Sequence, residues 1–260
     1  MSDMILVEPF ALSNTNISVS RGTGVANLTS FDPREVWQDI VPGSPATPAQ
    51  IDIDLGTSVT QWDVIALINT NAVTAAQWTI LTGASAPAVT ATPVSGSSLR
   101  VPSEDMADAN GPAVWVSATL QSSRYIRLAV TQPTGAAALT VGGVIVGKSW
   151  KPFYPREPGT GRPPIDTGVR TRLDDGGLST VPEKKLSGFK WVFGDLDPSD
   201  LAKLWGVIRR CRTTEPLLLI EDPGALVAEN IHYGTLTELE AYERRDQSKS
   251  RWAMSFEDWV

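Results

Sequence analysis

The sequence predicts a mainly β protein with an antiparallel β-sandwich over residues 1–150, a connector over 151–182, and a smaller α+β domain with one amphipathic helix over 183–260. Three observations predict this organisation. Short apolar or alternating segments separated by turn residues recur through the first part, which is typical of antiparallel sandwiches. Proline and glycine are frequent in the connector. A helical spacing of apolar residues appears only after it.

The first part contains several segments of strand character. Residues 51–56 alternate apolar and polar side chains and end at a glycine, which is the pattern of a half-buried strand. Residues 64–68 form a continuous apolar run of strand length, as expected for a buried central strand. The other expected strands are residues 77–82, 114–120, 124–130 and 139–147.

The connector combines prolines, glycines and basic residues. Proline cannot donate a ladder hydrogen bond, so this segment is expected to be extended with few backbone pairings. Its basic side chains make a locally positive segment in an acidic chain. Two interpretations stay open, a solvated linker and an arm that lies on a neighbouring subunit. The basic residues are Lys148, Lys151, Arg156, Arg162, Arg170 and Arg172.

The last part begins with a strand at residues 189–193 and a clear helix start. Asp197 is a typical N-cap, Pro198 fits the first turn, and Asp200 is placed near the positive end of the helix. Apolar residues then follow at helical spacing and give one stripe on the helix. This stripe is Leu201, Leu204, Trp205 and Ile208.

Three more strands are expected at residues 216–220, 231–237 and 251–259, with a charged hairpin that has an exposed tip at 238–250. The chain has nine tryptophans, and cores and subunit contacts use this side chain for its large area and single polar group. A ligand-binding surface is the alternative use. The aromatic residues expected in the C-terminal core or in assembly contacts are Trp191, Trp205, Tyr233, Trp252 and Trp259.

Composition excludes several functions. A formal net charge of −7 disfavours general nucleic-acid binding, which needs a positive field. No apolar run approaches the roughly 20 residues that span a bilayer. The first residues lack the pattern of a signal peptide, so we expect synthesis in the cytoplasm. The one cysteine, Cys211, excludes an internal disulfide and is expected to be a buried thiol within the helix.

The sequence offers no catalytic constellation. With one histidine and one cysteine, a transition-metal site is not expected. Asp52 and Asp54 share a strand face and could touch calcium, but solvent-facing polar residues explain them more simply. His232 is the one candidate general base, and it lies in an expected strand as a packed or interface residue. We therefore expect no catalytic residues, no metal, no cofactor and no enzymatic activity, although paired acids for glycan hydrolysis are not ruled out among 29 acidic residues.

Residues 12–150 resemble galactose-binding-like jelly-roll domains. The resemblance lies in the strand ending Leu55-Gly56, the apolar segment 62–71, Trp78 on the following strand, and the segment 123–128, Ser-Arg-Tyr-Ile-Arg-Leu. It implies a jelly-roll sandwich. It leaves function open, because this fold serves both sugar binding and scaffolding.

The arrangement as a whole is similar to structural proteins of tailed-phage tail tips and baseplates. A sandwich followed by residues 147–152, then by 216–220, Asp222-Pro223, 231–236 and Phe256-Glu257, resembles distal tail and related baseplate proteins. The order differs, because in common distal tail proteins the tube-like domain comes first. The resemblance implies a virion protein that forms a homo-oligomeric ring, a hexamer or trimer, and that contacts tail tube, hub and fibre proteins.

The alternative function is a carbohydrate-binding module for host-surface glycan. Its best candidate site is the loop of residues 31–39, in which Trp37 could stack on a sugar while Asp32 and Arg34 bind hydroxyl groups. The simpler interpretation makes Trp37 a plug that closes the end of the sandwich.

Overall fold

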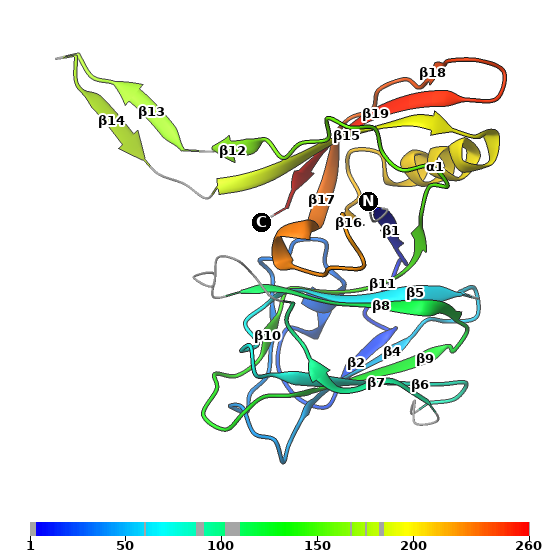
Figure 1. Ribbon diagram of the computed structural model, residues 1–260. Coiled ribbons are helices and arrows are strands. Elements are labelled where there is room, and N and C mark those ends of the chain that lie inside the picture. The colour runs from blue at the N-terminus through cyan, green and yellow to red at the C-terminus, as the bar shows by residue number, and fades with distance from the viewer. Residues whose placement is uncertain are drawn as a thin grey trace.

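The computed structural model describes residues 4–59, 61–86, 91–101, 110–166, 168–174, 176–181 and 185–259. It confirms the fold class, a mainly β protein with antiparallel pairing and a single α-helix in the described part, α1 (Pro198–Cys211). Figure 1 shows the two sheets of the sandwich below and the C-terminal sheet with α1 above.

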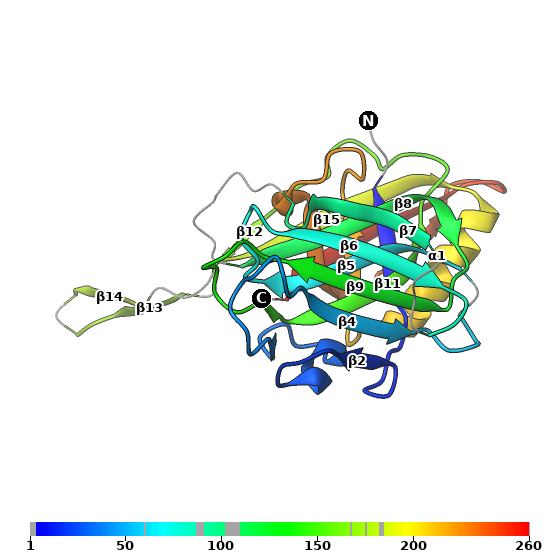
Figure 2. The same cartoon turned by 90° about the horizontal axis from the view of Figure 1, so that it is seen from below.

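The lower part of the molecule in Figure 1 is a two-sheet sandwich, which Figure 2 shows from below. One sheet has five strands in the order β2 (Ile17–Val19), β4 (Ala49–Asp54), β9 (Tyr125–Thr131), β6 (Gln77–Gly83) and β7 (Ala91–Ser98). The facing strands are β11 (Gly143–Trp150), β5 (Trp62–Thr70) and β8 (Gly111–Gln121). The short pair β3 (Trp37–Gln38) and β10 (Thr140–Val141) and the 3-10 helix η1 (Val25–Thr29) complete this part.

Alternation along the strands fills the sandwich core. On β4 and β9 every second residue is buried, so that Ile51 lies opposite Leu128 inside while Asp52 lies opposite Arg127 outside. This is the period of two that a half-buried strand requires. From β5, Ile65 and Leu67 enter the same core.

The facing strands of the sandwich belong to a larger sheet that continues into the C-terminal part. Its order is β12 (Pro164–Asp166), β15 (Lys185–Leu196), β19 (Ser250–Asp258), β17 (Ile231–Glu238), β16 (Leu217–Ile220), β1 (Ile5–Pro9), β11, β5 and β8. The two-residue strand β18 (Glu243–Arg244) pairs with β19, and the 3-10 helix η2 (Ala228–Asn230) precedes β17.

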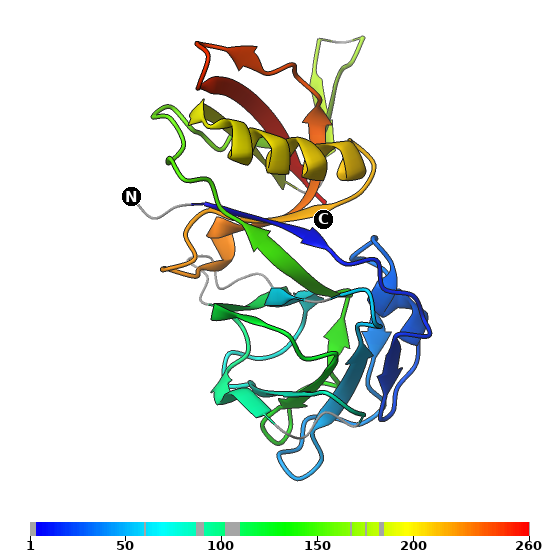
Figure 3. The ribbon, with the colours of Figure 1, turned by 90° about the vertical axis from the view of Figure 1, so that its right-hand side faces the viewer.

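Strand β1 connects the two halves of this sheet (Figure 3). It pairs with β11 on one side, Leu6 opposite Trp150, and with β16 on the other, Leu6 opposite Leu219. The contact with β11 is close at Gly147, where a Cβ atom would lie 2.6 Å from the carbonyl oxygen of Glu8. A side chain at this position would force the two backbones apart.

The connecting strands are apolar on both faces because each face covers a different core. On one face, Val7 of β1, Ala66 of β5 and Leu218 of β16 share a cluster that spans both halves. On the other face, Leu6 and Leu219 join the C-terminal cluster, while Leu67 joins the sandwich cluster. This accounts for the continuous apolar runs at 64–68 and 216–220, which the sequence marks as buried strands.

The helix forms where the sequence predicts it. The Asp197 carboxylate accepts a 2.8 Å hydrogen bond from the backbone N–H of Asp200, as an N-cap does. Leu204 and Ile208 of the expected stripe are buried against the C-terminal sheet, but Trp205 is 44% exposed. The buried stripe instead includes Val207 and Cys211.

The connector differs from the sequence expectation. Residues 151–163 lack regular pairing apart from an isolated bridge, as expected, but β12 follows, and β13 (Val169–Arg172) and β14 (Leu178–Val181) form a hairpin. No proline occurs between 165 and 181, and the β-branched residues there favour strands. Gly176 supplies the positive φ of 84° that the turn needs.

Strand β1 is expected to hold the whole fold together, so Leu6→Ala should destabilise it strongly. Leu6 is fully buried, and emptying such a site costs about 3 kcal/mol. Urea denaturation measures the free energy of unfolding, with Leu120→Ala as the control because Leu120 is 46% exposed. Equal stability of the two variants would contradict this role of β1.

Candidate assembly surface and its buried anchor

The hairpin β13–β14 is a paired element that is exposed along its whole length. It extends away from the body together with β12 (Figures 1 and 2). Every residue of both strands is exposed, including Val169, Leu178 and Val181, and Leu173 in the turn is 48% exposed. Val169 lies opposite Val181, and Arg172 opposite Leu178, so each face of the hairpin presents apolar side chains. We call residues 164–181 the arm.

An isolated two-stranded hairpin is marginally stable in water, because it buries too little apolar surface to offset the entropy of ordering its chain. In the described part of the chain the arm receives no covering layer, while its exposed leucine and valine side chains are of the kind that subunit interfaces bury. The arm therefore has the chemistry of a contact surface. Unpaired strand edges add a second means of pairing with another chain.

The chain segment that leads to the arm is fixed to the edge of β15. The backbone N–H of Glu157 donates to Val192, and Gly161 and Lys190 exchange two hydrogen bonds of 2.9–3.0 Å. The N–H of Gly188 then donates to Pro163 at 3.0 Å. This segment covers the edge of the C-terminal sheet and sets the direction in which the arm leaves.

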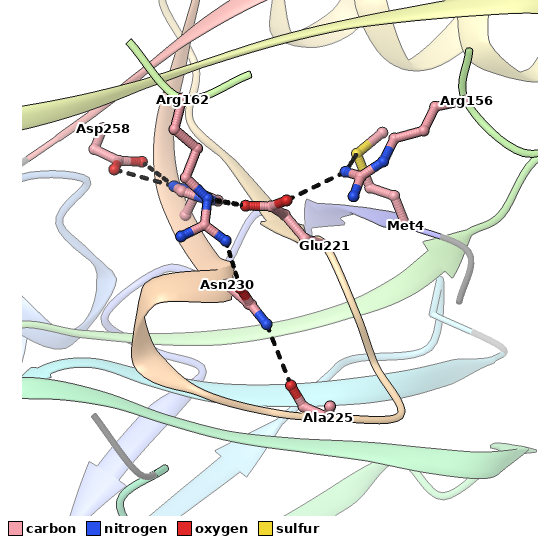
Figure 4. A network of polar contacts seen from close by, with 8 residues as sticks. Met4, Arg156, Arg162, Glu221, Ala225, Asn230 and Asp258 are labelled. Carbon is pink, nitrogen blue, oxygen red and sulfur yellow. Dashed lines mark hydrogen bonds and ion pairs between the residues drawn. The ribbon is translucent and has the colours of Figure 1, made fainter. Parts of the chain in front are cut away.

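Two arginines of this segment reach a buried carboxylate, Glu221, at the end of β16 (Figure 4). Arg162 Nε donates to Glu221 Oε1 at 2.5 Å, and Arg156 Nη1 donates to Oε2 at 3.3 Å. Arg162 also donates to the side-chain oxygen of Asn230. The Arg156 guanidinium lies 5.4 Å from the centre of the Phe189 ring, a distance at which cation–π attraction acts.

His232 completes this network from β17. It is 3% exposed and stacks on Phe189, with ring centres 5.3 Å apart. Its Nδ1 lies 3.1 Å from the Asp258 carboxylate and its Nε2 lies 3.0 Å from Glu221. Both partners accept hydrogen bonds, so both ring nitrogens are satisfied only when each carries a proton. His232 is thus a packed histidine, one of the two roles expected from the sequence.

The charges of the network stabilise one another. Burial lowers the pKa of His232, but hydrogen bonds to Asp258 and Glu221 outweigh this effect and raise the pKa to about 9. Burial raises the pKa of Glu221, but hydrogen bonds from His232 and Arg162 outweigh it and hold the pKa below its usual range. For Asp258 burial dominates and raises the pKa, partly offset by His232. We call Arg156, Arg162, Glu221, His232 and Asp258 the anchor.

The residues proposed for sugar contact do not form a site. Trp37 is 0% exposed, so its ring face cannot stack on a ligand, and it closes the end of the sandwich as a plug. Asp32 and Arg34 form an ion pair with each other at the surface, with 2.7 Å between Arg34 Nη2 and Asp32 Oδ2. The hydrogen bond from Arg34 lowers the pKa of Asp32 to about 2.

The predicted C-terminal aromatic residues divide into two groups. Trp191 and Trp252 are buried in the C-terminal core. Trp205 is exposed on α1, while Tyr233 lies at the junction of the two halves, where its hydroxyl donates to the carbonyl of Phe31 at 3.2 Å. Trp259 is half-buried, and its backbone N–H donates to the backbone carbonyl of Tyr233 at 2.7 Å.

The remaining candidates for chemistry have structural roles. Cys211 is buried, and burial raises the pKa of its thiol to about 12, as expected of an unreactive cysteine. Asp52 and Asp54 each hold an arginine of β9 or of the turn before it in a two-pronged ion pair. Within the described residues no group of three or more His, Cys, Asp or Glu side chains is arranged so that it could hold a metal ion. The helix found there, α1, is too short and too polar to cross a membrane.

A depression of about 450 Å³ lies beside these ion pairs, between β2, β4 and β9. Its polar lining includes Asn16, Ser18, Asp54 and Tyr125. The Arg124 guanidinium lies 4.8 Å from the centre of the Tyr125 ring and binds Asp54 at 2.5 Å. An aromatic ring is thus placed next to a fixed carboxylate.

No protein-family model matches the chain, and no curated protein matches it in sequence. Solved structures match about half of the chain. CpGH89CBM32-6 of Clostridium perfringens is 12% identical, covers 54% of this chain and 99% of its own, and has a TM-score of 0.40. Chitosan-binding module 1 of a chitosanase/glucanase from Paenibacillus sp. IK-5 gives 16% identity, coverage of 54% and 98%, and a TM-score of 0.40.

A third match is XRCC1 in a structure with the catalytic domain of DNA polymerase β, with 16% identity, coverage of 54% and 99%, and a TM-score of 0.41. At these sequence identities and TM-scores the matches support no conclusion about function. Their names differ in what is bound, chitosan in one case and the catalytic domain of DNA polymerase β in another. The assignment of fold class therefore rests on the strand order and burial described above.

The sequence did not reveal the anchor as a unit. The sequence shows the basic residues of the connector and the lone histidine. Arg162, Glu221 and Asp258, however, are far apart in the chain, and the pairing of β16, β17 and β19 brings them together. Only the register of these strands places them side by side.

The anchor predicts a specific dependence of stability on pH. His232 has a folded pKa of about 9, above its ordinary value of 6.5, so its contribution is complete below pH 6.5 and is lost as pH rises through 9. The pKa of Glu221 in the folded protein lies below its ordinary value. Glu221 therefore stabilises the fold at pH values above its ordinary pKa, and this stabilisation is lost as the pH falls through the folded pKa. The free energy of unfolding should fall by up to about 3 kcal/mol between pH 6.5 and 9.5, at about 1.4 kcal/mol per pKa unit.

The matched comparison is His232→Gln, which can still donate to one of the two carboxylates but cannot titrate. Denaturation at a series of pH values should show a flatter alkaline slope for this variant. Parallel curves for the two proteins would remove His232 as the source of the dependence.

Proposed function

We propose that this protein is a non-enzymatic structural subunit that assembles with copies of itself through the arm. The observation that carries this proposal is an ordered hairpin with apolar residues exposed on both faces and a charged anchor at its base. Structural subunits use such arms to bridge neighbours. Homo-oligomers gain specificity when the arm leaves the body in a fixed direction, because less entropy is lost on association.

The joint between the two halves supports the same function. Strand β1 makes one continuous sheet of the sandwich and the C-terminal part. Backbone hydrogen bonds and a shared core therefore fix the orientation of one half relative to the other, and a force on one half acts on the other as well. A scaffold needs this rigidity, whereas independent binding modules are usually separated by mobile linkers.

The setting that we propose is a tailed-phage-type tail tip or baseplate. Its support is the sequence resemblance of residues 147–152 and of the C-terminal strands to distal tail and baseplate proteins. In that setting the subunit is part of the virion and links the tail tube to hub and fibre proteins as a hexameric or trimeric ring. Its role there requires fitted surfaces and no reaction centre.

Assembly should depend on the arm. Light scattering after size-exclusion chromatography should give an oligomer for the full chain and a monomer when residues 168–181 are replaced by a short Gly-Ser turn. Because the arm contributes nothing to the three hydrophobic clusters, the shortened protein should keep its circular dichroism spectrum and melting temperature. A full chain that stays monomeric at high concentration would refute the proposed function.

A second candidate function is glycan binding by the sandwich, and the depression beside Tyr125 favours it. Sugar sites combine an aromatic face with a few fixed polar groups. Tyr125, Asp54 and Ser18 supply such a set in a depression of about 450 Å³. This location replaces the loop around Trp37, which the structure closes.

Glycan binding should then depend on the Tyr125 ring. Tyr125→Ala should weaken binding on a glycan array about tenfold or more, as loss of a central aromatic contact does. Tyr154→Ala is the control, because Tyr154 is 41% exposed and lies outside the depression. Absence of binding by the unmodified protein, or equal binding by both variants, would exclude this site.

A further inference from the structure

A second exposed apolar surface lies on the side of the C-terminal part opposite the arm. It is formed by Trp205 and Tyr242, together with Leu239, which directly precedes Glu240, the residue to which Trp252 is hydrogen-bonded, and we call these three residues the aromatic patch. Trp205 is 44% and Leu239 is 52% exposed. Trp205 lies 6.1 Å from Tyr242 and 5.7 Å from Trp252 between ring centres. Partly exposed tryptophan and tyrosine on a rigid base are typical of the centres of protein interfaces.

The aromatic patch is held in a fixed shape. Trp252, buried beneath it, donates from Nε1 to the carbonyl oxygen of Glu240 at 2.9 Å and so fixes the chain between β17 and β18. Tyr242 packs on the same indole at 5.7 Å. The patch therefore needs little ordering when a partner binds, which lowers the entropic cost of association.

The arm and the aromatic patch lie at opposite ends of the molecule. In Figure 1 the hairpin β13–β14 extends to the left, while α1 and β18 are at the right, and the view from below in Figure 2 keeps the arm and α1 at opposite ends. One copy therefore cannot cover its own patch with its own arm. The two surfaces remain available to different neighbours.

The charges of the two surfaces are complementary. The β17–β18 side of the patch carries exposed glutamates at 238, 240 and 243, and Glu243 is 73% exposed. The arm presents Arg170 and Arg172 on β13 next to its apolar residues. Arg209 lies four residues after Trp205 on α1, so the two side chains are neighbours on the helix surface. Opposite charges around an apolar centre favour one register of docking.

We propose that the arm of one copy docks on the aromatic patch of the next copy, head to tail. This inference rests on the proposed function and names its contact. Leu178 covers Trp205 and Leu239, and Arg170 and Arg172, which share the face of Leu178 in the hairpin, meet the glutamates between β17 and β18. Because the donor and acceptor surfaces differ, the contact is heterologous, and repetition with closure gives a ring.

The test mixes two variants that each lack one surface. The donor-only protein carries Trp205→Glu and Leu239→Glu, and the acceptor-only protein has residues 168–181 replaced by a short Gly-Ser turn. Mass photometry should show each alone as a monomer and the mixture as a heterodimer that grows no further. Leu120→Glu, at an exposed site of the sandwich, is the control and should assemble like the unmodified chain.

A charge exchange gives an independent check. Arg170→Glu with Arg172→Glu should weaken assembly about tenfold or more, and Glu240→Arg with Glu243→Arg in the other partner should restore it. Normal assembly of the Trp205→Glu, Leu239→Glu protein would overturn the docking site while leaving the arm-dependent function intact. Loss of assembly with no heterodimer in the mixture would also overturn it, since the two surfaces would then not be partners.

Discussion

The pairing of β1 with both β11 and β16 is the interaction on which the rest of the structure depends. It converts two sets of strands into one sheet and gives them a common apolar cluster around Val7. Every other element takes its orientation from this sheet. The sandwich closes over one of its faces, α1 covers another part of it, and the arm leaves from its far edge.

The anchor shows how a buried charge network can serve geometry. Burying charged groups costs free energy that their mutual attraction offsets only when each is well paired. Here two arginines of an otherwise irregular segment meet one carboxylate, and a histidine connects that carboxylate to a second one. An apolar contact of equal area would hold the segment with less directional precision, which matters where an exposed hairpin has to leave at a set angle.

Local patterns in the sequence predicted the elements that have a period or a cap. Each of these patterns matched an observed element. They are the alternation at 51–55, the apolar runs at 64–68 and 216–220, and the Asp197 cap. Contacts between strands that are far apart in the sequence could not be predicted from these local patterns. The pairing of β1 with β11 from the middle of the chain and with β16 nearer its C-terminal end depends on which strands become neighbours. Trp205 fitted the helical period but lies at the edge of the buried face.

The position of β1 also constrains how the chain reaches this structure during synthesis. Strand β1 is made before both of its partners and can pair with them only after residues 143–150 and then 217–220 have been made. Until then Leu6 and Val7 have no core to enter, and the sandwich lacks a cover for the outer face of β5 and β11. A nascent chain stopped before β16 therefore presents apolar surface to its surroundings. Strands that are made later complete the burial of β1.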